Sequence, residues 1–174
     1  LLSVTRIRLS EARDLTLADV DLKQSVLTIR GAKFGQWRLV PIHSSTSAIL
    51  ADYIERRTQF FRHPVSIYLF VSRRGTRLDG GHVHRTFYTL SHKTGLRAVG
   101  ASKGPRLHDF RHRFAVQTLI RWYQTNKEPG REIPLLSTYL GHVCVSGTYW
   151  YLSANPDLMA QAMSRLERRW GGAS

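Results

Sequence analysis

The stretch His108–Tyr123, HDFRHRFAVQTLIRWY, predicts an amphipathic helix whose first turns carry a cluster of basic side chains. His108, Arg111 and His112 are spaced i, i+3 and i+4, so they lie on one face of that helix. The same face continues as a predicted buried stripe of Ala115, Leu119 and Trp122. We therefore expect two imidazoles and a guanidinium to point toward the interior at a helix N-terminus, where an anion such as phosphate would compensate for their burial.

Two other interpretations of this cluster are weaker. Any one of the three residues alone is more often a hydrogen-bonded core histidine or an arginine that reaches the surface, but three on one arc favour a site. His108 and His112 have the spacing of zinc-binding helices, yet Asp109 rather than glutamate follows the first histidine. Arg111 would also place a positive charge beside the metal. We expect no metal and no cofactor.

Composition limits the class of protein. The chain has 174 residues, 42% of them apolar, which is enough for one domain with a hydrophobic core. Its 4 Trp, 7 Tyr and 7 Phe exclude a disordered basic tail. A single cysteine excludes an internal disulfide, and no apolar run approaches the ~20 residues of a membrane span. We expect a soluble protein that acts in the cytoplasm, associated with the nucleoid.

The charge points to a polyanionic partner. Lysine and arginine number 26 against 12 acidic residues, a formal net charge of +14, and they are spread through every segment. A merely solvated cationic surface is the alternative, but a folded basic surface of this size is typical of nucleic-acid binding.

The hydrophobic pattern predicts a mainly helical fold with a small antiparallel sheet, an α+β class. A helical segment is expected through about Leu17, with a local start or restart of the helix at Ser10 and Glu11. Residues 31–35 are expected to join strands 26–29 and 38–42 in a hairpin. Strand 67–71 is expected to be a third strand, and residues 124–134 a loop. Further helices are expected at 44–60, 83–95, 108–123, 135–141, 148–152 and 155–168, the last capped by Asn155.

Several short sequence blocks resemble the conserved motifs of a known family. His108–His112 resembles the His-x-x-Arg signature of the tyrosine recombinase (phage-type integrase) family, and Leu140–His142 resembles its next block. Tyr151, nine residues beyond His142, stands where the family has its nucleophile. Each block alone is weakly specific, but the order and separations of the set are highly specific.

The resemblance extends to the first half of the chain. Thr5–Glu11 is similar to the family's first arginine block, with Arg8 as the catalytic arginine. Lys33 lies in the turn of the expected hairpin, and Arg38–Pro41 follows it as in the segment that presents the catalytic lysine. The family usually has glycine where this chain has Arg6, which is expected to perturb the entry to this block.

The resemblance implies roles for these residues. Tyr151 would attack a DNA phosphorus and form a 3′-phosphotyrosyl link, with Arg8 and Arg111 stabilising the charge on the phosphate oxygens. Lys33 would protonate the leaving 5′-oxygen, His108 would take the tyrosine proton, and His142 would donate to the phosphate. Glu11 and His112 would support the site, although an exposed carboxylate is an equal alternative for Glu11.

Tyr149 and Cys144 lie close in sequence to the expected nucleophile. Tyr149, Trp150 and Tyr151 form an aromatic cluster, and such clusters are more often core than reactive. The family spacing selects Tyr151 over Tyr149. Cys144 is expected to be a small buried side chain.

Basic residues outside these blocks are expected to contact DNA phosphates of a double-stranded partner. They are Arg73, Arg74, Arg77, His84, Arg85 and Lys103. The amphipathic segment 155–168 is expected either to pack on its own domain or to dock on a neighbouring copy in a homo-oligomer, a tetramer on DNA.

The resulting hypothesis is a catalytic domain over residues 1–174 that breaks and rejoins DNA without metal or ATP, as an integrase or transposase of a bacterial or phage mobile element. The N-terminal core-binding domain of the family is expected to be missing from this sequence. The alternatives are an inactive DNA-binding accessory domain and an enzyme like the type IB topoisomerases.

Overall fold

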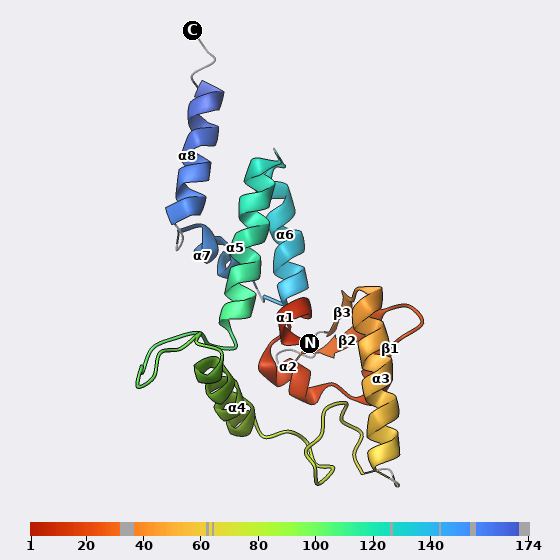
Figure 1. Ribbon diagram of the computed structural model, residues 1–174. Coiled ribbons are helices and arrows are strands. Elements are labelled where there is room, and N and C mark those ends of the chain that lie inside the picture. The colour runs from red at the N-terminus through yellow and green to blue at the C-terminus, as the bar shows by residue number, and fades with distance from the viewer. Residues whose placement is uncertain are drawn as a thin grey trace. The chain divides into compact units, whose positions relative to one another are not determined.

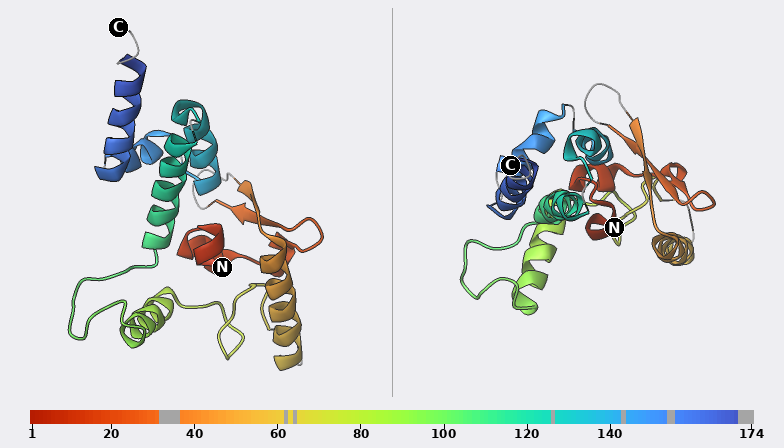
Figure 2. Two further views of the ribbon diagram at one scale, coloured as in Figure 1. Left: turned by 45° about the horizontal axis from the view of Figure 1, so that its top comes forward. Right: turned by 90° about the horizontal axis from the view of Figure 1, so that it is seen from above.

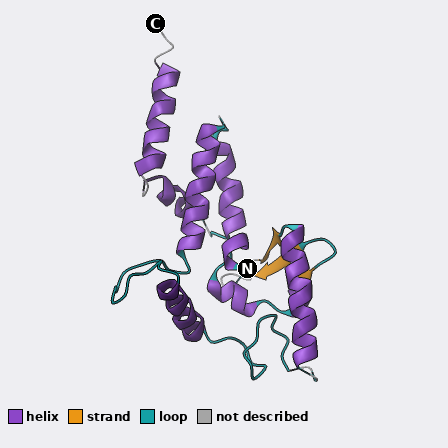
Figure 3. Cartoon of the chain, in the orientation of Figure 1, coloured by secondary structure: helices purple, strands orange, loops and turns teal. Residues whose placement is uncertain are grey.

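The structure is a computed structural model that describes residues 1–31, 37–61, 63, 65–125, 127–142, 144–153 and 156–170. Most of these residues are helical, and three short strands form one antiparallel sheet, which confirms the predicted fold class (Figure 1, Figure 3). The chain divides into two compact units, Leu1–Arg111 and His112–Ser174, and each is described by itself. None of the helices in the described ranges is long and apolar enough to cross a membrane.

The first unit begins with two short helices, α1 (Leu2–Thr5) and α2 (Leu9–Asp14). A second helix start near Ser10 agrees with the prediction, but the helical segment ends at Asp14 rather than at about Leu17. The chain breaks at Arg6, which adopts the left-handed conformation with φ 59° and ψ 15° and ends α1. This conformation is unfavourable for a residue with a Cβ and is the usual place for glycine at the end of a helix.

A three-stranded sheet follows, in the order β1-β2-β3. After a short 3₁₀ turn at Leu17–Asp19 come β1 (Val20–Asp21), β2 (Val26–Arg30) and β3 (Trp37–Pro41). The hairpin of β2 and β3 confirms the prediction, with Ile29 opposite Arg38. Side chains alternate, so that one face is buried and the other is exposed. The turn that carries Lys33 lies outside the described residues.

Two helices complete the first unit. Helix α3 (Ser44–Phe60) runs beside the sheet (Figure 2) and begins at His43, whose imidazole accepts a hydrogen bond from the Ser45 N–H. The predicted strand 67–71 is wrong, because this segment makes only the isolated bridges Thr16–Tyr68 and Val71–Arg77. Helix α4 (Gly80–Lys93) is capped by the Asp79 side chain and is followed by Gly95 at φ 72°.

The second unit is helical. Helix α5 (Asp109–Gln124) begins in the first unit and continues into the second, where α6 (Pro129–Leu140), α7 (Ser146–Ser153) and α8 (Pro156–Trp170) follow. The predicted loop over 124–134 is therefore too long, because α6 starts at Pro129, where the missing N–H of proline costs nothing. The expected cap Asn155 lies outside the described residues.

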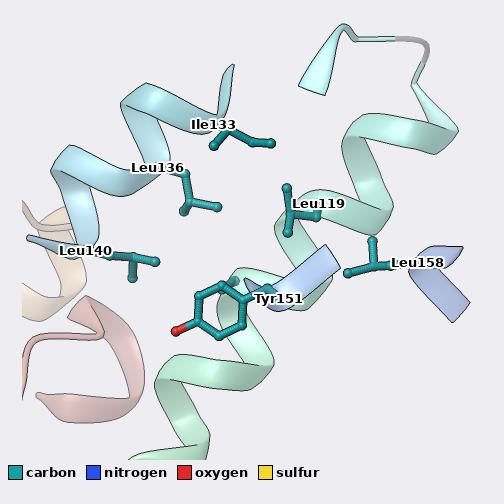
Figure 4. Close-up of a cluster of buried hydrophobic side chains, with 7 residues drawn as sticks. Leu119, Ile133, Leu136, Leu140, Tyr151 and Leu158 are labelled. Atoms are coloured by element: carbon teal, nitrogen blue, oxygen red, sulfur yellow. The ribbon is translucent and has the colours of Figure 1, made fainter. Parts of the chain in front are cut away.

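The core of this unit joins side chains from all four helices. Helices α5 and α6 lie side by side (Figure 2), and α7 and α8 add one buried residue each to the cluster in Figure 4. The buried members are Ala115, Leu119, Ile133, Leu136, Leu140, Tyr151 and Leu158. Tyr151 is therefore held by packing as well as by its helix.

Candidate active site

Arg8 is placed by the start of α2. It is the N-cap residue, with an extended backbone at φ −69° and ψ 153°. Its backbone N–H donates to Glu11 Oε2 at 2.7 Å, and its guanidinium Nη1 donates to Glu11 Oε1 at 2.9 Å. Glu11 thus satisfies the N-cap backbone donor and holds the Arg8 side chain, and its burial is at odds with the alternative of an exposed carboxylate.

Glu11 is buried and ionised between two arginines. Arg38 on β3 donates from Nη1 to Glu11 Oε1 and from Nη2 to Oε2, each at 3.0 Å. Burial alone would raise the pKa of the Glu11 carboxyl, but the hydrogen bonds from Arg38 and from the Arg8 backbone, with the charges of both arginines, lower it below its usual value. Arg38 is not among the site residues predicted from the sequence, although it lies in a block that carries the resemblance.

Arg111 is buried in the first turn of α5, with 3% of its surface exposed. Its Nη1 donates to the backbone carbonyl of Arg6 at 3.0 Å. The left-handed conformation of Arg6 therefore has a consequence for the site, because the residue at this break between α1 and α2 supplies the acceptor for Arg111.

A cavity of about 170 Å³ in the first unit brings these groups together. Arg8, Arg111 and His108 line it, as does His84 of α4, with apolar walls that include Ile7 and Phe110. The expectation that all three basic residues of the 108–112 block point inward is wrong for His108. Arg111 is buried and His112 half-buried, but His108 precedes α5 and is exposed. A cavity with two guanidinium groups and two imidazoles suits a single phosphate group.

The second unit positions Tyr151 and two histidines. The ring centroids of His112 and Tyr151 are 5.4 Å apart in an edge-to-face arrangement, and those of His142 and Tyr151 are 6.1 Å apart and stacked. Tyr151 is 3% exposed, whereas Tyr149 is 48% exposed. In Figure 4 the Tyr151 hydroxyl points away from Leu119 and Leu158.

His142 is oriented by a residue that the sequence analysis missed. Its Nδ1 and the Thr148 hydroxyl lie 2.7 Å apart, and Thr148 is fully buried. This contact engages Nδ1 and fixes how the imidazole ring is turned. A single threonine six residues downstream carries no periodic signal that would have revealed this contact.

The residues predicted to contact DNA differ in their surroundings. Arg73 and Arg74 are exposed at the tip of a tight turn closed by Ser72 and Thr76, whose hydroxyls lie 2.9 Å apart. Arg77 is half-buried, pairs with Asp14 and lies over the Tyr68 ring.

The remaining three lie on α4 and in the loop after it. His84 lines the cavity with Arg8, and Arg85 is exposed on α4. Lys103 lines a second cavity of about 670 Å³ together with Arg97 and Arg106. Asp109 also lines this cavity and pairs with Arg106.

The prediction that Cys144 is buried is wrong. Its side chain is exposed, and its Sγ lies 2.8 Å from the Ser146 hydroxyl. This hydrogen bond, with backbone N–H groups of Gly147 and Ser146, holds the pKa of the thiol below its ordinary value.

Comparisons with known proteins identify the family of this chain. The sequence matches the phage integrase family over residues 1–157. The protein y4rB of Sinorhizobium fredii, named as an integrase/recombinase, is 59% identical over 171 residues, which are 98% of this chain and 54% of y4rB.

Two solved structures share the fold. The crystal structure of XerA recombinase superposes with a TM-score of 0.71 at 27% identity, covering 94% of this chain and 54% of that one. XerH, a site-specific recombinase bound to its palindromic difH substrate in a post-cleavage complex, superposes at 0.69 with 20% identity, over 95% of this chain and 44% of XerH. The chain spans about half the length of the curated relatives it matches. The extent of the family match, together with the blocks around Arg8, Arg111 and Tyr151, shows that this chain belongs to the phage integrase family.

Proposed function

We propose that this chain is the catalytic part of a site-specific tyrosine recombinase, which breaks and rejoins double-stranded DNA through a covalent 3′-phosphotyrosyl intermediate. The observation that carries the proposal is the cavity in which Arg8 and Arg111 lie together with His108. Two arginines at one small cavity provide charge and directed donors for a phosphate, the electrostatic work that Mg²⁺ performs in many nucleases. An accessory domain without activity would have no need of this arrangement.

In the proposed reaction the Tyr151 hydroxyl attacks the scissile phosphorus. A bond forms between the tyrosine oxygen and phosphorus, and the bond from phosphorus to the 5′-oxygen breaks. The tyrosine proton goes to His108, and Lys33 gives a proton to the leaving 5′-oxygen. Arg8, Arg111 and His142 donate to the non-bridging oxygens. Attack by a second 5′-hydroxyl reverses these steps and reseals the strand without ATP.

The proposed partner is duplex DNA held through its phosphates. The exposed Arg73, Arg74 and Lys103 are suited to this contact. Arg85 is also suited, because its ion pair with Asp79 is long, at 3.9 Å, and exposed, whereas Arg77 is already engaged by Asp14. XerH was solved with DNA bound, which supports the same partner for this chain. Such a protein would act in the cytoplasm on the nucleoid, and integration or transposition of a mobile element is its proposed role.

We also propose that copies of the chain assemble on DNA as a homo-oligomer, a tetramer in which α8 docks on a neighbour. Leu158, near the start of α8, is fully buried in its own unit. Further along the helix, Met159, Met163 and Trp170 are at least half exposed. An apolar surface of this kind on a helix is typical of a protein contact.

The proposal is tested with a duplex that carries a nick beside a randomised core. Cleavage next to the nick releases a short fragment, so the covalent adduct accumulates and denaturing electrophoresis detects it. The wild-type chain should form the adduct in EDTA, and sequencing the trapped DNA should define the site. Tyr151→Phe should form none.

Tyr149→Phe is the matched control, because Tyr149 lies two residues away on the same helix and is exposed. It should retain the adduct. An adduct that needs Tyr149 rather than Tyr151, or that needs Mg²⁺, contradicts the mechanism. A wild-type chain that binds DNA and forms no adduct favours the accessory domain.

A further inference from the structure

Arg8, Glu11 and Arg38 form an ion triad in the first unit. The side chain of Glu11 is 7% exposed, that of Arg38 13% and that of Arg8 38%. Each Glu11 oxygen accepts one hydrogen bond from Arg8 and one from Arg38, at distances between 2.7 and 3.0 Å. The carboxylate is thus fixed from two sides.

The two arginines differ in their relation to the cavity. Arg8 lines the cavity that also contains Arg111. Among the described lining residues of that cavity Arg38 does not occur, and its guanidinium faces Glu11 with both Nη atoms. Arg38 therefore acts on Glu11, and Glu11 in turn contacts Arg8.

The two-donor geometry determines the orientation of the carboxylate. A guanidinium that bonds both oxygens holds the carboxylate plane, whereas a single donor would let it rotate. Arg38 is itself held on β3, where its neighbour Val40 is fully buried and its partner across the ladder is the buried Ile29.

The triad also has an electrostatic consequence. One carboxylate faces two guanidinium groups, so the three side chains together keep a positive charge. If Arg8 alone faced Glu11, the pair would be neutral. A positive charge beside the cavity favours a bound phosphate.

We propose that Arg38 is a positioning residue for the reaction: it holds and partly neutralises Glu11, so that Glu11 aligns Arg8 for the scissile phosphate without cancelling its charge. This inference rests on the function proposed above. Arg38 touches neither DNA nor the reacting atoms in this role, so its loss changes the rate of the chemical step rather than the affinity for DNA.

The experiment measures the single-turnover rate of adduct formation with saturating nicked DNA, and separately the dissociation constant for that DNA. Arg38→Met keeps an unbranched apolar stem and removes the charge and the donors of the guanidinium. It should lower the rate by about 10-fold to 100-fold, because small displacements of a catalytic group cost that much. The dissociation constant should stay the same, and Arg38→Lys should give an intermediate rate.

Arg30→Met is the matched control. Arg30 is on the neighbouring strand and donates to the buried Asp19 at 2.7 Å, so it is also an arginine of the sheet paired with a buried carboxylate. Its variant should keep the wild-type rate. Melting curves of all variants report whether the fold is intact, and if Arg38→Met does not fold, Arg38→Lys decides, because it retains charge and length.

A double-mutant cycle identifies the route of the effect. Glu11→Gln should itself slow the reaction, and Arg38→Met should then add little, because both changes act on one contact. If the two effects multiply, Arg38 acts independently of Glu11 and the inference is wrong.

The results that would overturn this inference differ from those that would overturn the proposed function. A wild-type rate in Arg38→Met or in Arg38→Lys overturns the inference, and so does a loss confined to DNA affinity. None of these results affects the proposed function as long as the wild-type chain forms the Tyr151 adduct. If the wild-type chain binds DNA and forms no adduct, the proposed function fails instead.

Discussion

Glu11 makes the stability of the first unit depend on pH. Its pKa is lowered in the folded chain, so the folded state holds the proton less tightly than the unfolded state. The stabilisation is present above the unfolded pKa of about 4.3 and is lost as the pH falls through the lower folded value. Arg8 and Arg38 both lose their anionic partner in this range.

Replacing Glu11 by Gln should therefore cost about 3 kcal/mol of unfolding free energy at neutral pH, because a buried charge partner is removed. The difference from wild type should shrink as the pH falls below about 4.3. Urea unfolding between neutral and acid pH measures it. Asp52→Asn is the control, since Asp52 forms an exposed ion pair with Arg56. A difference that is constant with pH would contradict the assignment.

Arg6 stores backbone strain at the break before α2. Its φ of 59° costs a residue with a Cβ about 1 kcal/mol, a cost that glycine avoids. Arg6→Gly should raise the unfolding free energy by about this amount, measured by urea unfolding. Arg6→Ala separates the backbone from the side chain, because alanine keeps the strain. An equal gain in Arg6→Ala would place the effect in the side chain.

The sequence predicted some residues of this site and not others, for a physical reason. Arg8 and Arg111 lie in recognisable blocks of spacing and type. The part played by Arg38 depends on a contact with Glu11, 27 residues away, that only the sheet creates. Neither helical nor strand periodicity reports which buried carboxylate an arginine will meet.

At the scale of the elements, α7 presents both Tyr151 and the partner of His142. Thr148→Val keeps the volume of the side chain and removes the hydroxyl that lies 2.7 Å from His142 Nδ1. The His142 ring then loses its fixed orientation. The single-turnover rate should fall about tenfold, as for other residues that orient a functional histidine.

Thr138→Val on α6 is the matched control, because its hydroxyl only donates to the Pro134 carbonyl of the same helix. Its rate should match wild type. If Thr148→Val also matches wild type while His142→Ala slows the reaction, the hydrogen bond has no role in orienting His142.

The elements themselves were predicted where local signals agree. The β2–β3 hairpin and α4 follow from alternation, apolar spacing and the glycine after α4. Segment 67–71 has β-branched and aromatic residues, but its pairing with residues 15–17 amounts to one isolated bridge in the described part of the chain, too short for a strand, so propensity alone misled. The pair Pro129-Gly130 is typical of a loop, but proline is also favoured in the first turn of a helix, and Pro129 begins α6.

At the scale of the whole molecule, the net charge of +14 serves two purposes under the proposed function. Arg8, Lys33 and Arg111 act on one phosphate. The larger remainder binds the backbone of the duplex through counterion release, which depends on salt. The two parts should therefore respond differently to ionic strength.

DNA affinity should fall steeply with salt, whereas the rate of adduct formation by bound DNA should change little. We plot the logarithm of the binding constant against the logarithm of the salt concentration. If Arg73, Arg74, Arg85 and Lys103 each neutralise one phosphate, the slope of this plot should be about −3.6 or steeper.

Replacing Arg73 and Arg74 together by alanine should make that slope shallower by about two, because each phosphate contact contributes about one. Arg56→Ala, which removes an exposed arginine already paired with Asp52, should leave it nearly unchanged. Fluorescence anisotropy over a salt series gives the slope, and quenched single-turnover reactions at saturating DNA give the rate. A cleavage rate that falls with salt as steeply as the affinity would mean that surface charge takes part in the chemical step, and the division between catalytic and binding charge would then be wrong.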